Sequence, residues 1–394
     1  MLQRSESSQN INFTMKILTA IGILLVISGH FGSTLLSFGN LYPYDTFHMA
    51  MFVFISGYFY QDKNHTNFLS CAAYIKKKFL HLMLPYFLWN IFYYFINRML
   101  AQVGFKIGNT RADEVSLFTF FVRPFQMGDG FGYNVAAWFL GMIFLVEVIN
   151  VIFRFLLKKV QLDRHWILLP AYFLIGYSGV CIAKSDWESS WKIAVTRTMY
   201  MLFWYYCGLF YKKYLEKYDN QMNPFASLTL NIAAACFLVT IFGNEVSIVY
   251  TSKFLGYPIV MILRSALGIL FWLRISKMLT DCLKDCRPFI YIGNHTFSLM
   301  MHQGLAGIVL NGLIALSSRV ICGENVLDME KYKTAIWYGY APSDIPSFRN
   351  FYVLFIPILI LLFVKLFEKI YDSNFFKSRI YCIRNIMPVS LKKN

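Results

Sequence analysis

The sequence has few charged residues, and it lacks the motifs that mark nucleotide or serine-acyl chemistry. Only 15% of its 394 residues are charged, which is too few for the surface of a soluble globular protein of this length. We find no Walker-type loop, no Rossmann glycine fingerprint and no Gly-x-Ser-x-Gly elbow. Nucleotide hydrolysis, NAD chemistry and a serine–acyl intermediate therefore have no motif to support them.

The cysteines form no regular pattern. The eight are scattered singly along the chain, apart from Cys282 and Cys286. That pair lacks a second ligand pair nearby, so the sequence predicts neither a metal site nor a disulfide framework. Residues 1–12 form a polar segment without an Ala-x-Ala-type cleavage site, so we expect the first apolar span to be retained as an anchor. We predict a single transmembrane domain at 13–372, followed by a basic cytoplasmic tail at 373–394.

Apolar residues dominate the chain, at 57% of the total, with 19% aromatic. This composition predicts an all-α polytopic membrane protein. A helix needs about 20 mostly apolar residues to cross the hydrocarbon core, and about ten stretches meet or approach that length. They are 13–37, 42–60, 79–101, 134–157, 165–183, 192–211, 224–243, 255–276, 288–315 and 350–371. The segment 316–349 is predicted to be the main loop outside the membrane.

Basic residues are distributed unevenly between the loops. The net charge of +16 would suggest nucleic acid on a soluble chain. Here the basic clusters, such as 76–78, 212–217 and the tail, fall on alternate loops, whereas the other loops carry nearly balanced charges. The positive-inside rule places the basic side in the cytoplasm. We therefore predict ten spans with both termini cytoplasmic and no nucleic-acid partner.

Three histidines lie within or at the ends of predicted spans: His30, His48 and His302. An ionisable group at membrane depth is costly and by default marks a functional site. At 1.5 Å per residue, His30 lies about 25 Å and His302 about 21 Å from the inner end of their spans, and His48 lies near the outer boundary. Inward-running spans place other polar or aromatic side chains within about 15 Å of that boundary. They are Asn134, Trp138, Arg197 and Arg264.

A common depth predicts that these side chains line one cavity. Helical periodicity supports this, because Thr19 and His30 share a face with Lys16 slightly displaced, and His295, Ser298 and His302 are spaced i, i+3 and i+7. Each residue also has a simpler explanation. A single histidine can be hydrogen-bonded between helices, Trp138 can belong to the aromatic belt, and the two arginines can extend toward the outer surface.

Histidine in such a cavity can remove the proton of an alcohol that attacks a carbonyl, an effect worth about 10²–10⁴-fold. Direct transfer of an acyl group is then simpler than a covalent intermediate. Arginine and lysine side chains along the route could bind the phosphates of a donor such as a coenzyme A thioester.

Four segments, in order along the chain, resemble motifs of the acyltransferase-3 family of bacterial integral membrane O-acyltransferases. They are AIGILLVISGH at 20–30, FHMAMFVFISGY at 47–58, NVAAWFLGMIF at 134–144 and IGNHTFSLMMH at 292–302. The resemblance is to the short members, which are related to sugar O-acetylases.

This resemblance implies a ten-helix core in the bacterial cell (plasma, or inner) membrane, among membrane lipids. It implies an acyl-CoA donor, with acetyl-CoA expected, as a substrate and no bound cofactor. The acceptor would be a hydroxyl of a cell-surface polysaccharide or its lipid-linked precursor. His30 would be the general base, with His48 and His302 as further catalytic candidates.

One position departs from the family pattern. The family usually has Arg or Lys eleven residues before the first histidine, where this chain has Thr19. Lys16 is the expected substitute for donor binding, and Asn134, Trp138, Arg197, Arg264 and Ser298 are the other binding candidates. The alternative function is a polysaccharide exporter or flippase, since polar groups would line its path equally well. Loss of an acyltransferase leaves glycan export intact and removes only the ester.

Overall fold

The computed structural model describes residues 12–107, 116–126, 131–244 and 246–372. The predicted tail at 373–394 and all but the last residue of the predicted 1–12 segment lie outside this part. The long helices are α1 (Phe13–His30), α2 (Tyr44–Tyr58), α3 (Phe68–Lys78), α4 (Leu84–Gln102), α7 (Trp138–Lys159), α8 (His165–Ala183), α9 (Lys192–Phe210), α11 (Pro224–Phe242), α12 (Pro258–Leu283), α14 (Thr296–Cys322) and α16 (Asn350–Asp372).

Short elements connect and extend these helices. The short α-helices are α5 (Leu117–Phe121), α6 (Arg123–Gln126), α10 (Glu216–Gln221), α13 (Arg287–Asn294) and α15 (Met329–Thr334). The 3₁₀ turns are η1 (Gly39–Leu41), η2 (Asp62–His65), η5 (Gly132–Ala137), η7 (Val249–Thr251) and η8 (Pro346–Arg349), and the π-helical turns are η3 (Phe79–Met83) and η6 (Tyr211–Leu215). Strands β1 (Ser247–Ile248) and β2 (Lys253–Phe254) pair antiparallel, with Ser247 opposite Phe254.

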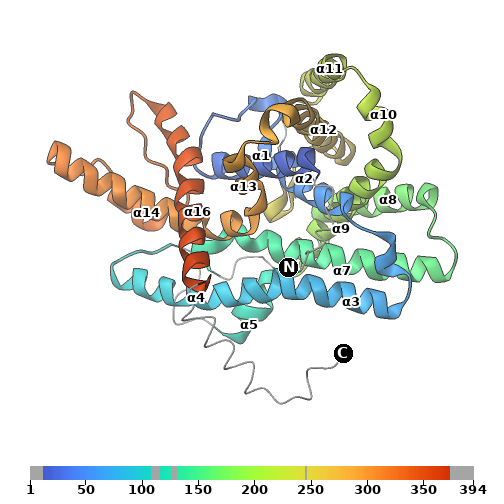
Figure 1. The fold of residues 1–394 in the computed structure, drawn as a ribbon, viewed down its shortest axis with the longest axis horizontal. Coiled ribbons are helices and arrows are strands. Elements are labelled where there is room, and N and C mark those ends of the chain that lie inside the picture. The colour runs from blue at the N-terminus through green and yellow to red at the C-terminus, as the bar shows by residue number, and fades with distance from the viewer. Residues whose placement is uncertain (1–11, 108–115, 127–130, 245, 373–394) are drawn as a thin grey trace, which may run out of the picture.

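The prediction of an all-α polytopic membrane protein is confirmed. Each of the ten predicted spans contains a helix, and eight helices of the described chain are long and apolar enough to cross a membrane. The other two are α2, which has 15 residues, and α9. Most residues of both helices are buried, and Figure 1 shows α2 near the centre of the bundle, so most of their side chains contact protein and need not match lipid. The orientation of the chain stays a prediction.

Glycines allow α2 and α9 to approach closely. A Cβ atom on Gly57 would lie 1.8 Å from the carbonyl oxygen of Tyr205, and one on Gly208 would lie 1.9 Å from that of Phe54. Small residues at such positions let membrane helices pack backbone to backbone. The contact fixes α2, and with it His48, against the rest of the bundle.

Two predicted spans have different ends in the structure. The first helix ends at His30 and not at 37, because Gly32 adopts a left-handed conformation with φ of 65° and terminates it. The predicted helix 288–315 is broken at His295 into α13 and α14. The predicted face shared by His295, Ser298 and His302 is therefore wrong, since His295 precedes α14. The loop predicted at 316–349 begins later, after α14 ends at Cys322.

A buried ion pair joins the loop between α7 and α8 to η2. Arg154 is 1% exposed and donates through Nε and Nη2 to the carboxylate of Asp163, which also accepts a 3.0 Å hydrogen bond from His65 Nε2. Burial alone would raise the pKa of Asp163, but the hydrogen bonds from His65 and Arg154 lower it to about 2. This pair holds one end of the bundle together.

Candidate active site

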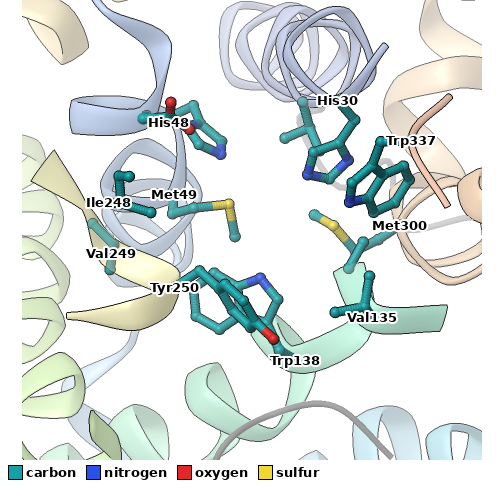
Figure 2. Close-up of a pocket in the computed structure, with 13 residues that line it drawn as sticks. His30, His48, Met49, Val135, Trp138, Ile248, Val249, Tyr250, Met300 and Trp337 are labelled. Atoms are coloured by element: carbon teal, nitrogen blue, oxygen red, sulfur yellow. The ribbon is translucent and has the colours of Figure 1, made fainter. Parts of the chain in front are cut away.

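A cavity of about 210 Å³, here called the histidine cavity, lies where α1, α2, η5, α7, α14 and the β1–η7 segment meet. Its lining consists of Val26, His30, Asp45, His48, Met49, Val135, Ala136, Trp138, Ile248, Val249, Tyr250, Met300 and Trp337. Figure 2 shows His30 and Trp337 on one side of the cavity, His48 on the other, and Trp138 and Tyr250 along the wall facing both histidines. Three predicted site residues, His30, His48 and Trp138, are therefore brought together.

Gln303 fixes the tautomer of His30. Its Nε2 donates to the Met300 carbonyl at 3.3 Å, which leaves Oε1 facing His30 Nδ1 at 3.0 Å. An amide oxygen can only accept a hydrogen bond, so Nδ1 carries the proton of the neutral ring. His30 Nε2 is then the nitrogen with a free lone pair, as a general base requires.

Trp337 holds the plane of the His30 ring. The two rings stack with centroids 3.9 Å apart and an angle of 20°. Trp337 lies in the loop after α15, and its ring centroid is 5.7 Å from that of Phe31, with the two rings nearly perpendicular. Since His30 is the last residue of α1, this loop closes over the end of the helix.

His48 is oriented in the same way as His30. Its Nδ1 lies against the Tyr44 carbonyl one turn earlier on α2, and because a carbonyl only accepts, Nδ1 is the protonated nitrogen. His48 is 7% exposed. The cavity thus contains two histidines whose Nε2 atoms carry the lone pairs.

Arg197 supports the cavity wall from behind and does not line it. Its guanidinium lies 4.6 Å from the centre of the Trp138 ring, and Nη1 donates to the Tyr250 carbonyl at 3.2 Å. The side chain is 1% exposed. A cation over an indole face is attracted by the ring, so Arg197 fixes the positions of Trp138 and Tyr250.

A second cavity, also of about 210 Å³ and here called the lysine cavity, lies further along the same helices. It is lined by Thr19 of α1 and by Lys78, whose Nζ lies 2.5 Å from Glu147 Oε1. Thr19 and His30 are eleven residues apart, about 16 Å along α1. Met300 lines both cavities and is the side chain between them.

Other predicted residues lie outside the histidine cavity. The prediction that His302 shares it is wrong: its Nδ1 hydrogen-bonds the Tyr93 hydroxyl at 2.9 Å, and its ring packs against Trp89 at 4.3 Å. Because adjacent residues on a helix point about 100° apart, Gln303 faces His30 while His302 faces α4.

The remaining polar candidates have structural contacts. Arg264 donates to the Gly243 carbonyl at the end of α11. Asn134 donates to Asn90 at 2.7 Å and so holds η5 against α4. Neither lines the histidine cavity.

The lysine predicted to bind the donor, Lys16, lines neither cavity. Lys16 Nζ donates to Asn294 of α13, and Lys16 does not line the lysine cavity. The cation that lines this cavity together with Thr19 is Lys78. Ser298 lies half-buried on α14 and lines neither cavity.

Several site residues were missed by sequence reasoning. Glu147 carried a usable signal, because it is an acidic residue within a predicted span. Lys78 belongs to the lysine run that we used only for orientation. Gln303 also carried a signal, because it is a polar residue within the predicted span 288–315. Trp337 carried none, since it lies in the predicted loop 316–349.

The fold and these cavities define a multi-pass membrane protein with a histidine cavity and a second, cation-bearing cavity that share the side chain of Met300. Residues 15–364 match the family model Acyl_transf_3, described as an acyltransferase domain. The chain belongs to this family and is a membrane acyltransferase. No curated protein and no solved structure matches the chain.

Proposed function

We propose that this protein is an O-acyltransferase of the bacterial plasma membrane. It moves an acyl group, with acetyl as the expected one, from acyl-CoA to a hydroxyl of a cell-surface polysaccharide or its lipid-linked precursor. The observation that carries the proposal is the pair of cavities along α1, with His30 in one, Lys78 in the other and Met300 between them. Such a pair suits two substrates that approach from opposite sides.

His30 acts as the general base. Its Nε2 takes the proton of the acceptor hydroxyl while that oxygen attacks the thioester carbonyl, and the proton then passes to the departing coenzyme A sulfur. Gln303 stabilises the required tautomer throughout. The stacked Trp337 ring favours the imidazolium that forms, because an aromatic face attracts a cation.

The donor enters through the lysine cavity. Lys78 is 29% exposed there and offers a positive charge to a donor phosphate. Glu147 is 1% exposed and anchors the ammonium group at the cavity wall. The run 76–78 lies on the predicted cytoplasmic side, where acyl-CoA is made available.

The acceptor occupies the histidine cavity. Trp138 and Tyr250 present aromatic faces, with ring centroids 5.5 Å apart, and Asp45 supplies a carboxylate acceptor for sugar hydroxyls. Arg197 keeps both rings in place. An aromatic wall with a few polar groups is typical of sites that bind small polar ligands.

The experiment compares the surface glycan of a deletion strain with that of the wild type by proton NMR. We expect glycan in normal amount that lacks an acetyl signal, restored by the wild-type gene. Loss of surface glycan itself would instead support the exporter or flippase function, and an unchanged acetyl signal would contradict the proposal.

A further inference from the structure

An apolar groove of about 630 Å³ runs along the outside of α1, α13 and α16. Its lining includes Leu24 of α1, Leu36 of the loop that follows, Phe289 and Ile292 of α13, and residues of α16. In Figure 1, α1 and α13 lie next to α16, with α14 on the far side of α16. The groove is separate from both cavities of the proposed active site, since they share no lining residue with it.

The groove has the length of one membrane leaflet. Its lining on α16 extends from Val353 to Lys365, twelve residues apart and so about 18 Å. The hydrocarbon core is about 30 Å thick, so one leaflet contributes about 15 Å. Pro357 and the apolar residues between these ends are lined up along the groove.

The groove combines an apolar length with a charged end. Apolar side chains line it along α16, and the charged residues of its described lining, Arg287 and Lys365, are both basic. A membrane lipid has the matching arrangement of hydrocarbon chains below a charged headgroup, which favours a lipid over an apolar transmembrane segment.

Two basic side chains lie at one end of the groove. Arg287 opens α13, and Lys365 lies on α16 with its Nζ 5.2 Å from the centre of the Tyr291 ring. Both side chains are exposed, and among the side chains that the structure describes no carboxylate lines the groove. This end follows the basic loop after α12, on the predicted cytoplasmic side, where anionic lipids are concentrated.

We propose that this groove is a binding site for an anionic glycerophospholipid of the cytoplasmic leaflet. The phosphate lies between Arg287 and Lys365, and an acyl chain follows α16 toward Leu36. The bound lipid braces α1, the helix that ends at His30. At the opposite end of the groove, the Phe31 and Tyr352 rings stack with their centroids 5.2 Å apart. This contact already joins the end of α1 to α16.

The test uses the full chain purified in an uncharged detergent. Its melting temperature is measured with added phosphatidylglycerol, with phosphatidylcholine and with inorganic phosphate, and native mass spectrometry counts the phosphatidylglycerol molecules retained. We expect a rise in melting temperature with phosphatidylglycerol alone, because a ligand that binds only the folded state stabilises it.

The double variant Arg287→Gln/Lys365→Gln removes the charges of the site. Each basic residue near an anionic lipid surface strengthens binding about fivefold, so the apparent affinity for phosphatidylglycerol should fall by roughly 25-fold. The matched control is Lys284→Gln/Lys369→Gln, which removes two charges at the same end of the bundle from residues outside the groove lining. It should retain wild-type affinity.

A second variant fills the groove without changing its charge. Ile358→Trp places an indole among the apolar lining residues and should reduce the retained phosphatidylglycerol by one molecule. Equal stabilisation by phosphatidylcholine would overturn the proposal, as would equal losses in the two double variants. Stabilisation by inorganic phosphate alone would mean a phosphate site with no lipid tail, and this too would overturn it.

Discussion

Replacement of Gln303 by Glu tests how the His30 base is prepared. In the structure Gln303 Oε1 accepts the Nδ1 proton of His30 at 3.0 Å, and the amide nitrogen is committed to the Met300 carbonyl. Gln303 is fully buried. Glu has nearly the same shape, so the change replaces a neutral acceptor with a carboxylate and also removes the hydrogen bond to the Met300 carbonyl.

The carboxylate stabilises the charged form of the imidazole. An opposite charge within hydrogen-bonding distance shifts a protonation equilibrium by about 1–3 pH units. A higher pH is then needed to keep His30 in its neutral, basic form. We expect the acid limb of the pH–rate profile to move up by about 1–3 pH units, with near-normal transfer above that limb.

The assay measures transfer of labelled acetyl from acetyl-CoA to glycan in membranes between pH 5 and 9. Gln303→Leu serves as the control, because it keeps the volume but removes the acceptor. It should slow transfer by up to about 10²-fold, the lower end of what a general base contributes, without the upward shift. A folded Gln303→Glu protein whose profile matches the wild type would refute the role of Gln303.

Three further changes test the fold and the donor route. Asp163→Asn removes the closer of the two carboxylates that pair with buried Arg154 and leaves only Asp62, 3.4 Å from Nη2, so it should lower the free energy of unfolding by about 3 kcal/mol. Asp281→Asn, at a carboxylate 92% exposed, should change little. The pKa of Asp163 is 3.8 in the unfolded chain and about 2 in the folded protein. Ionised Asp163 therefore adds about 2 kcal/mol to the free energy of unfolding above pH ~4, and this contribution is lost as the pH falls through ~2. Gly208→Ala should cost at least about 1–3 kcal/mol, because α2 and α9 must separate. Thr19→Arg should retain or raise the affinity for acyl-CoA, because it adds a cation to the lysine cavity.

Melting curves in detergent measure the first two changes, and binding of labelled acyl-CoA to purified protein measures the third. Equal stability of the Asp163→Asn and Asp281→Asn proteins would contradict the structural role of the buried ion pair. A Gly208→Ala protein as stable as the wild type would contradict the close helix contact. Strong loss of donor binding in Thr19→Arg would mean that the cavity has no room for a second cation.

The sequence predicted the membrane helices and part of the site for one physical reason. Polar groups are costly in hydrocarbon, so both the apolar spans and the histidines within them are visible in one sequence. The eleven-residue spacing on the first helix likewise predicted that Thr19 and His30 lie on one face, and both line cavities along α1. His30, His48 and Trp138 do meet in one cavity.

The rest of the site depends on tertiary structure. A common depth assigned His302 to the cavity, and its shared face with His295 assumed one unbroken helix. The chain instead breaks at His295, and Gln303 is the residue that reaches His30. Trp337 reaches His30 from a loop whose path no periodicity specifies. The depth of Arg197 in the membrane could not show that it lies behind the wall of the cavity, because a depth does not say which way a side chain points around the helix.

The most direct test of the central proposal is acetyl transfer by a His30→Ala protein. Membranes containing this variant are supplied with labelled acetyl-CoA, and a His302→Gln protein, altered outside the histidine cavity, is measured beside it. We predict that His30→Ala remains folded by size-exclusion chromatography yet loses transfer by at least about 10²-fold, while His302→Gln still labels the glycan. Wild-type labelling by folded His30→Ala would contradict the assignment of His30 as the base.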